Sequence, residues 1–454
     1  MADKVEQGVH NYTDRYDYVV PEDSLVREKL EWFKDQKLGL MMHWGPYCQL
    51  GIVESWALSD ADGSWSRNGI DWVDGDMELF KRQYIDLNKT FNPVRFMPDQ
   101  WAKIARECGF RYLIFTTKHH DGFCMWDTKT TDYKITGKDC PYRNNKYADI
   151  VKHLFNAFRN EGLGIAAYFS KADWHSEYYW AEGHEHSQFR NRNTTYNTKE
   201  HPELWNKFVE YTHEQLRELL TDYGRIDILW LDAGWVCPQN NQDIRLHDII
   251  EEIRRTTQPG LIVADRTVGG VYENYVTPEQ TVPDEPMDIP WESNITLGTS
   301  FSFAYGDDYK PLRQVAHLLI DVVAKGGNLA LNIGPQPDGR LPRQALRSIH
   351  DLGHWLKVYG EAIYGTRPFA PYRTGNFAFT EKGRNVYAFH LYDDEDQELI
   401  SEITIPVDFN CKAVSMLGLD EKIYFDRTDN GIKVVVPHRE GKAPVCDVFV
   451  LSDG

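Results

Sequence analysis

The chain has 454 residues, a length that allows about three domains or one large barrel with an appendage. With 41% hydrophobic and 13% aromatic residues it can bury a full core, which excludes a mainly disordered chain. Its formal net charge of −19 repels phosphate backbones and anionic headgroups, so neither nucleic acid nor a membrane surface is an expected partner.

Along most of the chain, short apolar runs alternate with amphipathic stretches, which is typical of βα units. Strands are predicted at 38–44, 112–119, 164–170, 226–232, 261–266 and 328–334. Helices are predicted at 99–108, 148–161, 203–223, 243–258 and 311–325. This order predicts an α/β fold, a (β/α)8-like barrel, over residues 1–365. An open doubly wound sheet is the alternative, but no glycine-rich phosphate loop follows the first strand.

The pattern changes after a predicted helix at 344–359. From about Arg367 apolar and polar residues alternate with period two, at 385–391, 422–425, 431–436 and 445–451. Turn signals separate these runs. The pattern predicts a small antiparallel β-sandwich over 366–454, which either supports the barrel or binds carbohydrate.

Aromatic residues are abundant, with 14 Trp and 25 Tyr. Such rings fill large cores, but they also line sugar-binding clefts, where the apolar face of a pyranose stacks on them. Position decides between the two, because the active site of a barrel lies at the C-terminal ends of its strands.

Asp232 follows the apolar run 228–231 and is flanked by Trp230 and Trp235. A carboxylate pressed between indoles and given hydrogen bonds stays ionised yet poorly hydrated, as a nucleophile for an oxocarbenium-like centre requires. The alternative is an Asp that caps a helix or turn.

Three histidines, His43, His119 and His120, also fall at predicted strand ends. They could bind a metal, bind sugar hydroxyls or fill the core. No H-E-x-x-H motif accompanies them, and the pair His184 and His186 lies in a polar loop. We therefore expect neutral imidazoles that bind sugar hydroxyls, with no metal and no cofactor.

Hydrolysis of a glycoside with retention needs a second, protonated carboxyl about 5 to 5.5 Å from the nucleophile. Glu292 follows Trp291, and an adjacent indole with partial burial would raise its pKa as an acid catalyst needs. Glu54, near Trp56, is either a hydroxyl ligand or the acid. Further candidates in the segment after Arg266 are Glu273, Glu279 and Glu285.

Five strings in this order resemble the α-L-fucosidases of glycoside hydrolase family 29. They are HWG (43–45), KHHDGF (118–123), YFS (168–170), WLD (230–232) and KGGNLALNIGP (325–335). The resemblance implies a barrel followed by a β-sandwich, and a retaining double displacement without a metal. The sequence departs from the family where Asn294 replaces a usual Cys, and where the segment 303–306 replaces a later Trp-Gly-Tyr.

Carried onto this chain, the resemblance implies that Asp232 is the nucleophile and that Glu292 lies where the acid/base often stands. Residues expected to bind the sugar or line the site are His43, Glu54, Trp56, His119, His120, Tyr168, Trp230 and Arg266. The predicted function is removal of terminal α-L-fucosyl residues from oligosaccharides or glycoconjugates, with a fucosylated glycan as the substrate partner. Alternatives are an inactive fucose-binding protein, an α-L-galactosidase and a metal-dependent amidohydrolase.

The seven cysteines are odd in number and lack a C-x-x-C pair, so neither a disulfide framework nor a zinc site is predicted. No apolar run approaches the roughly 20 residues that span a bilayer, and the first 18 residues do not resemble a signal peptide. As written, the chain is expected in the cytoplasm; a secreted or periplasmic location would follow if a signal had been removed. The sequence leaves the oligomeric state open.

Overall fold

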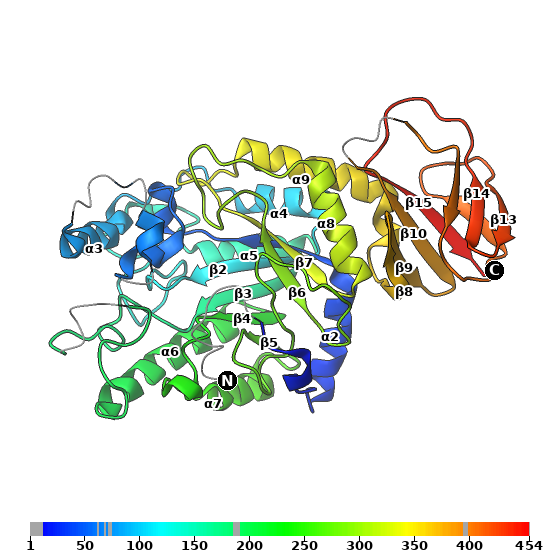
Figure 1. The fold of residues 1–454 in the computed structure, drawn as a ribbon. Coiled ribbons are helices and arrows are strands. Elements are labelled where there is room, and N and C mark those ends of the chain that lie inside the picture. Colours follow the sequence, from blue (N-terminus) through cyan, green and yellow to red (C-terminus); the bar gives the residue numbers. More distant parts are fainter. Residues whose placement is uncertain are drawn as a thin grey trace.

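The computed structural model describes residues 12–60, 63–67, 70, 75–184, 191–393 and 398–453. A parallel barrel sheet with helices around it is followed by a β-sandwich, which lies on the opposite side of the barrel from α3 (Figure 1). The predicted fold class is confirmed.

The barrel sheet has seven parallel strands in the order β5-β4-β3-β2-β1-β7-β6. They are β1 (Leu38–Met42), β2 (Tyr112–Lys118), β3 (Gly164–Ser170), β4 (Ile228–Asp232), β5 (Ile262–Asp265), β6 (Glu292–Thr296) and β7 (Asn328–Ile333). Six of them match predicted strands. The sequence analysis missed β6, because Glu-Ser-Asn-Ile-Thr is not an apolar run although every residue in it is buried.

An irregular segment, 272–280, fills the gap between β5 and β6. Its first part bonds to β5, where Asn274 donates its backbone N–H to the carbonyl of Val263 at 2.8 Å. Its second part bonds to β6, where Glu292 donates its backbone N–H to Val276 and Glu279 bridges to Asn294. We call this segment the seam, and it completes the barrel without a regular eighth strand.

Helices surround the barrel (Figure 1). They are α2 (Ser24–Gln36), α3 (Met77–Ile85), α4 (Pro98–Glu107), α5 (Ile150–Asn160), α6 (Pro202–Asp222), α7 (Leu246–Thr256), α8 (Leu312–Ala324) and α9 (Arg343–Tyr359). Between β1 and α4 the chain makes a long excursion that contains α3 and short 3-10 turns, among them Glu54–Leu58. This excursion supplies one wall of the pocket described below.

The second unit consists of two antiparallel sheets, β12-β15-β10-β9-β8 and β11-β14-β13, around a core of its own. Its strands are β8 (Arg367–Thr374), β9 (Phe377–Lys382), β10 (Asn385–Leu391), β11 (Glu402–Ile405), β12 (Ala413–Met416), β13 (Tyr424–Thr428), β14 (Gly431–Val435) and β15 (Cys446–Ser452). It packs on α8, where Arg313 donates to the carbonyl of Tyr392 at 2.6 Å and His317 bonds to that of Val445 at 2.9 Å. Its role as a support or a carbohydrate-binding unit stays a prediction.

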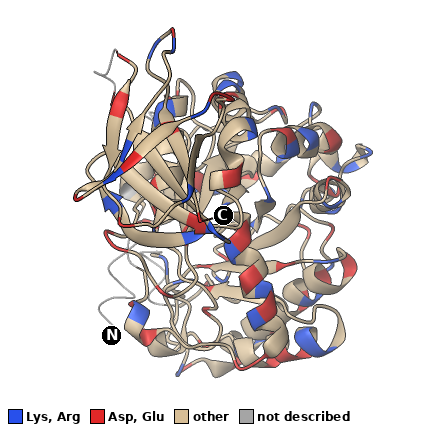
Figure 2. Ribbon diagram, turned by 90° about the vertical axis from the view of Figure 1, so that its right-hand side faces the viewer, with Lys and Arg blue, Asp and Glu red and all other residues tan. Residues whose placement is uncertain are grey.

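Acidic and basic residues are interspersed along the outer helices on the side shown in Figure 2, and neither sign gathers into one face there. Among the described residues, no helix has the length and apolarity that crossing a membrane requires.

Candidate active site

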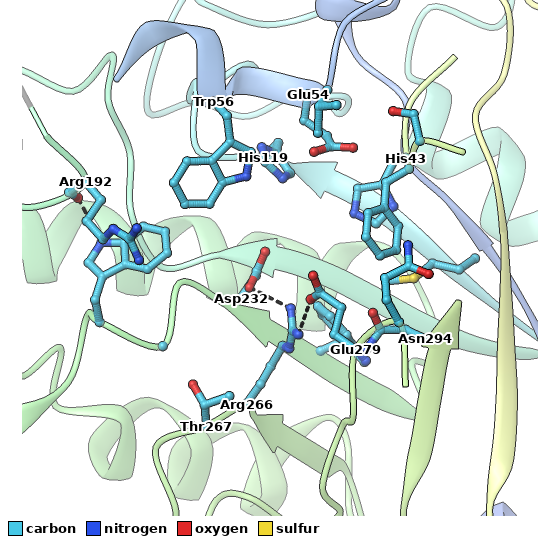
Figure 3. A pocket seen from close by; sticks show the side chains of 18 of the residues that line it. His43, Glu54, Trp56, His119, Arg192, Asp232, Arg266, Thr267, Glu279 and Asn294 are labelled. Carbon is cyan, nitrogen blue, oxygen red and sulfur yellow. Dashed lines mark hydrogen bonds and ion pairs between the residues drawn. The ribbon is translucent and has the colours of Figure 1, made fainter. Parts of the chain in front are cut away.

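A cavity of about 280 Å³ opens at the C-terminal ends of the barrel strands (Figure 3). Seven of the predicted site residues line it: His43, Glu54, Trp56, His119, Trp230, Asp232 and Arg266. Two more, His120 and Tyr168, contact Asp232 from behind the wall. The barrel thus brings together residues that lie more than 200 positions apart in the sequence.

Asp232 is the last residue of β4, and its side chain is 17% exposed. Its carboxylate accepts a hydrogen bond from the Tyr168 hydroxyl, and Arg266 Nη1 donates to Oδ1 at 3.0 Å. Burial by itself would raise the pKa of Asp232, but the Arg266 guanidinium and the Tyr168 hydroxyl together hold that pKa below its ordinary value. The carboxylate is therefore ionised, poorly hydrated and fixed in orientation.

The three histidines are each held through Nδ1, which leaves Nε2 for other contacts. The partners of Nδ1 are Asn332 Oδ1 at 2.8 Å for His43, Ser55 Oγ at 2.5 Å for His119 and Ser170 Oγ at 2.7 Å for His120. Burial lowers the pKa of His43 and of His120 to about 4, and that of His119 well below its ordinary value. All three are neutral at pH 7, as predicted for groups that bind hydroxyls.

Two glutamates share the pocket with Asp232. Glu279 pairs with Arg266, so one guanidinium holds Asp232 on one side and Glu279 on the other (Figure 3). Glu54 is 3% exposed, and its Oε1 has no hydrogen-bond partner among the described residues. Burial raises the pKa of Glu54 well above 4.5, and the charges of Glu279 and Asp232 raise it further. This environment favours the protonated form of Glu54.

Unusual backbone conformations gather at these side chains. Glu54 itself has a φ of 31°, and the residues that follow Asp232, Arg266 and Glu279 also have positive φ: Ala233 at 68°, Thr267 at 62° and Gln280 at 52°. Left-handed conformations cost free energy in non-glycine residues and persist where the surrounding structure enforces them, most often at functional sites. Each one turns the chain sharply beside a carboxylate or guanidinium that faces the pocket.

Glu292 does not line the pocket. It is the first residue of β6, whereas the pocket lies at the far ends of the strands, and its side chain is 0% exposed. It accepts hydrogen bonds from Tyr112, Trp230 and Tyr275, and burial raises its pKa to about 7. The predicted elevation of the pKa is present, but the carboxyl lies beneath the floor of the pocket.

Arg192 was not predicted. Its guanidinium lies 5.3 Å from the ring centroids of both Trp56 and Trp235, and its carbonyl accepts a hydrogen bond from Trp235 Nε1 at 2.8 Å. Trp65, half exposed, also lines the cavity. An arginine in a polar loop carries no sequence signal that separates it from a solvated charge, and only the indoles that hold it reveal its place.

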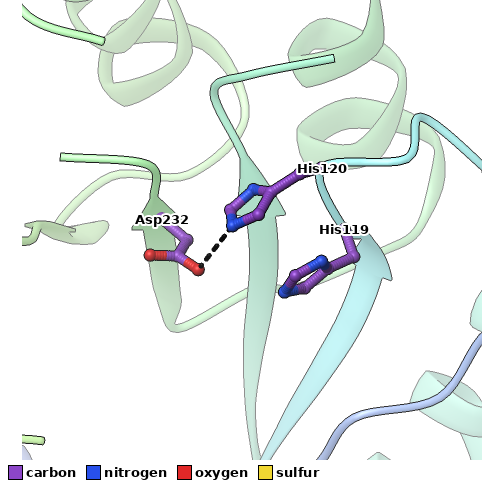
Figure 4. Close-up of side chains that lie close together, drawn as sticks. All are labelled: His119, His120 and Asp232. Atoms are coloured by element: carbon purple, nitrogen blue, oxygen red, sulfur yellow. Dashed lines mark ion pairs between the residues drawn. The ribbon is translucent and has the colours of Figure 1, made fainter. Parts of the chain in front are cut away.

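His119, His120 and Asp232 each offer one possible metal ligand atom, and these atoms lie within 4.8 Å of one another (Figure 4). Arg266, whose Nη1 is 3.0 Å from Asp232, already places a positive charge at this position, so a dication would meet strong repulsion. His186, from the other predicted histidine pair, lies outside the described residues.

Activity is therefore expected to survive metal chelation. Dialysis against EDTA should leave kcat/KM unchanged, because Arg266 already balances the charge on Asp232. Loss of activity that zinc restores would contradict this expectation.

A parallel barrel with paired carboxylates and indoles in a pocket at its C-terminal strand ends defines a barrel-type glycoside hydrolase. The family model for α-L-fucosidases matches residues 5–361, and the chain belongs to that family, glycoside hydrolase family 29. An α-L-fucosidase of Branchiostoma floridae is 27% identical over 421 residues, covering 87% of this chain and 86% of the relative.

Solved structures agree with this fold. The α-L-fucosidase isoenzyme 1 of Paenibacillus thiaminolyticus superposes with a TM-score of 0.75 at 26% identity, covering 94% of this chain and 99% of the other. An α-L-fucosidase of Bacteroides thetaiotaomicron, solved as a trapped covalent intermediate with 2-fluoro-fucosyl fluoride, has a TM-score of 0.76 at 23% identity and covers 98% and 99%.

Proposed function

We propose that the protein removes terminal α-L-fucosyl residues from glycans by a retaining double displacement. The observation that carries this proposal is Asp232: an ionised carboxylate at a strand end, bonded to Tyr168 and Arg266 and open to an indole-lined pocket. The covalent intermediate of the Bacteroides thetaiotaomicron relative supports a two-step reaction.

In the first step Asp232 attacks the anomeric carbon, the glycosidic bond breaks, and a carboxylic acid gives its proton to the departing oxygen. In the second step the same group, now a carboxylate, takes a proton from water, and the resulting oxygen nucleophile displaces Asp232. The proton donated in the first step is thus recovered, and fucose leaves with its anomeric configuration retained.

The proton donor in this proposal is a glutamate of the pocket wall. Glu54 meets the requirement for protonation in the resting enzyme, because it is buried and lacks a cation partner among the described residues. Glu279 meets the requirement for proximity, because it shares the Arg266 guanidinium with Asp232. Glu292, the donor expected from the sequence, does not line the pocket, so it would have to donate its proton from beneath the pocket floor.

The sugar itself would be held by complementary surfaces. The Nε2 atoms of the neutral His43 and His119 suit ring hydroxyls, while Met41, Trp230 and Phe301 form an apolar part of the lining that suits the C5 methyl group. Trp65 and Arg192, nearer the solvent, would face the leaving group.

The test is hydrolysis of an aryl α-L-fucoside followed by NMR in the first minutes. We expect α-L-fucose to appear first and then to mutarotate. First appearance of the β-anomer would mean inversion and overturn the mechanism. Measurable fucose binding with no turnover of any aryl fucoside would favour the inactive sugar-binding protein.

A limited side activity on α-L-galactosides is expected. L-Galactose adds one hydroxyl to the methyl group of fucose, and an apolar pocket disfavours such a change by only about 1–3 kcal/mol, or roughly 10- to 200-fold. The measurement is kcat/KM for an aryl α-L-fucoside divided by kcat/KM for the matching aryl α-L-galactoside. A ratio below one would make the protein an α-L-galactosidase.

A further inference from the structure

A buried carboxyl lies beneath the pocket floor at the junction of three barrel strands and the seam. Glu292 on β6 accepts hydrogen bonds from the Tyr112 hydroxyl at 2.5 Å, from Trp230 Nε1 at 3.1 Å and from the Tyr275 hydroxyl at 3.4 Å. Tyr112 belongs to β2 and Trp230 to β4. A group with this many donors in the barrel interior fixes the side chains that donate to it.

Trp230 connects this carboxyl with the nucleophile. Its ring lines the pocket, while its Nε1 points down to Glu292. The Tyr168 ring stacks on the indole, with centroids 5.0 Å apart and an interplanar angle of 20°, and the Arg266 guanidinium lies 4.5 Å from the indole centroid. Among the residues that the structure describes, Tyr168 and Arg266 are the two whose side chains hydrogen-bond to the Asp232 carboxylate.

We propose that Glu292 is a positioning residue: it fixes the Trp230 indole and, through that indole, the Tyr168 hydroxyl and the Arg266 guanidinium that orient Asp232. This inference rests on the proposed function. The carboxyl neither touches the sugar nor moves a proton in the reaction, and it acts only through the ring that it anchors.

The physical reason is that a flat indole held only by packing can tilt, whereas one whose Nε1 donates to a fixed acceptor has a single orientation. Without the acceptor, a buried N–H is left unpaired and the ring seeks another position. A displacement of about 1 Å at a reacting group can cost roughly 100-fold in rate, so loosening Trp230 is expected to slow both chemical steps.

Two substitutions at Glu292 and one at Trp230 test the proposal. Glu292→Gln keeps an acceptor for Trp230, and the Tyr112 hydroxyl can accept from the new amide, so kcat is expected to stay close to that of the wild type. Glu292→Leu removes the acceptor and is expected to lower kcat about 10- to 100-fold. Trp230→Phe keeps an aromatic ring but has no N–H, and its effect should not add to that of Glu292→Leu in the double variant.

The substrates distinguish positioning from proton donation. In Glu292→Leu the loss should be similar for fucosyl fluoride, which needs little protonation, and for a phenyl fucoside, and azide should restore neither. Activity should still fall at high pH in Glu292→Gln. Because glutamine cannot titrate, this fall would then come from a group other than residue 292.

The proposal is overturned if Glu292→Gln loses activity selectively on the phenyl fucoside and azide restores Glu292→Leu, because Glu292 would then be the acid itself. It is also overturned if Glu292→Leu keeps the wild-type kcat. If Glu292→Leu does not fold, the kcat values of Glu292→Gln and Trp230→Phe on the two substrates still test the proposal. Labelling of Asp232 by a 2-fluoro-fucosyl fluoride in Glu292→Gln is a separate readout, whose failure would count against the proposed function instead.

Discussion

Replacement of Asp232 by alanine or glycine is expected to lower kcat by about 1000-fold or more, roughly 4 kcal/mol of barrier. The side chain is the one carboxylate of the described pocket held by both Tyr168 and Arg266, and without it no covalent intermediate can form. The fold should survive, because the side chain is partly exposed and lies at the end of β4. The measurement is kcat for an aryl fucoside, together with the thermal unfolding midpoint.

Azide gives the positive control for the Asp232 variants. A small anion can enter the space that the carboxylate vacates and attack from the same face, so we expect rescued turnover with β-fucosyl azide as the product. Asp243→Asn is a matched control, since Asp243 is exposed and lies on the loop that follows the same strand. Near-normal turnover by Asp232→Ala would show that Asp232 is not the nucleophile.

The second large effect is expected at the pocket-wall glutamates. Alanine at the proton donor, Glu54 or Glu279, should lower the rate by about 100- to 10,000-fold on substrates with poor leaving groups and far less on activated ones. Azide should restore that variant with α-fucosyl azide as the product, because it attacks the intact fucosyl-enzyme. The alanine variant of the glutamate that is not the donor should lose activity on both kinds of substrate, and azide should not restore it.

The pH profile checks the same assignment. Burial raises the pKa of Glu54, so if it is the donor, activity is full below that pKa and falls as the pH rises through it. Glu54→Gln would then abolish the basic limb. If neither Glu54→Ala nor Glu279→Ala is rescued while a Glu292 variant is, the donor is the residue expected from the sequence.

Much of the barrel could be predicted because six of its strands are apolar on both faces. The strand β6 could not, since its polar groups find partners that lie far away in the sequence: the Glu292 carboxyl accepts a hydrogen bond from the Tyr112 hydroxyl, 180 positions earlier. Within the sandwich, β10 and β15 were predicted almost to the residue, whereas the four-residue strands β11 and β12 carry too short a pattern.

The site shows the same division. Asp232, His43 and His119 stand at or just beyond the ends of apolar strands, so their place could be predicted from position alone. Glu279 could not be singled out, because the seam has no regular period and its course is set by bridges to β5 and β6. For Glu292, the neighbouring Trp291 could not show where the carboxyl lies, since successive strand residues face opposite sides and that indole packs outside the barrel interior.

Because the seam both lines the pocket and closes the barrel, a ligand bound in the pocket stabilises the closed barrel. Arg266 directly follows β5 and Glu279 belongs to the chain that bridges to β6, so a molecule that contacts both joins the two sides of the opening. By mass action, such a molecule raises the free energy of unfolding as its concentration exceeds its dissociation constant. A reversible inhibitor of this enzyme is therefore also a folding aid, and destabilised variants would regain abundance in its presence.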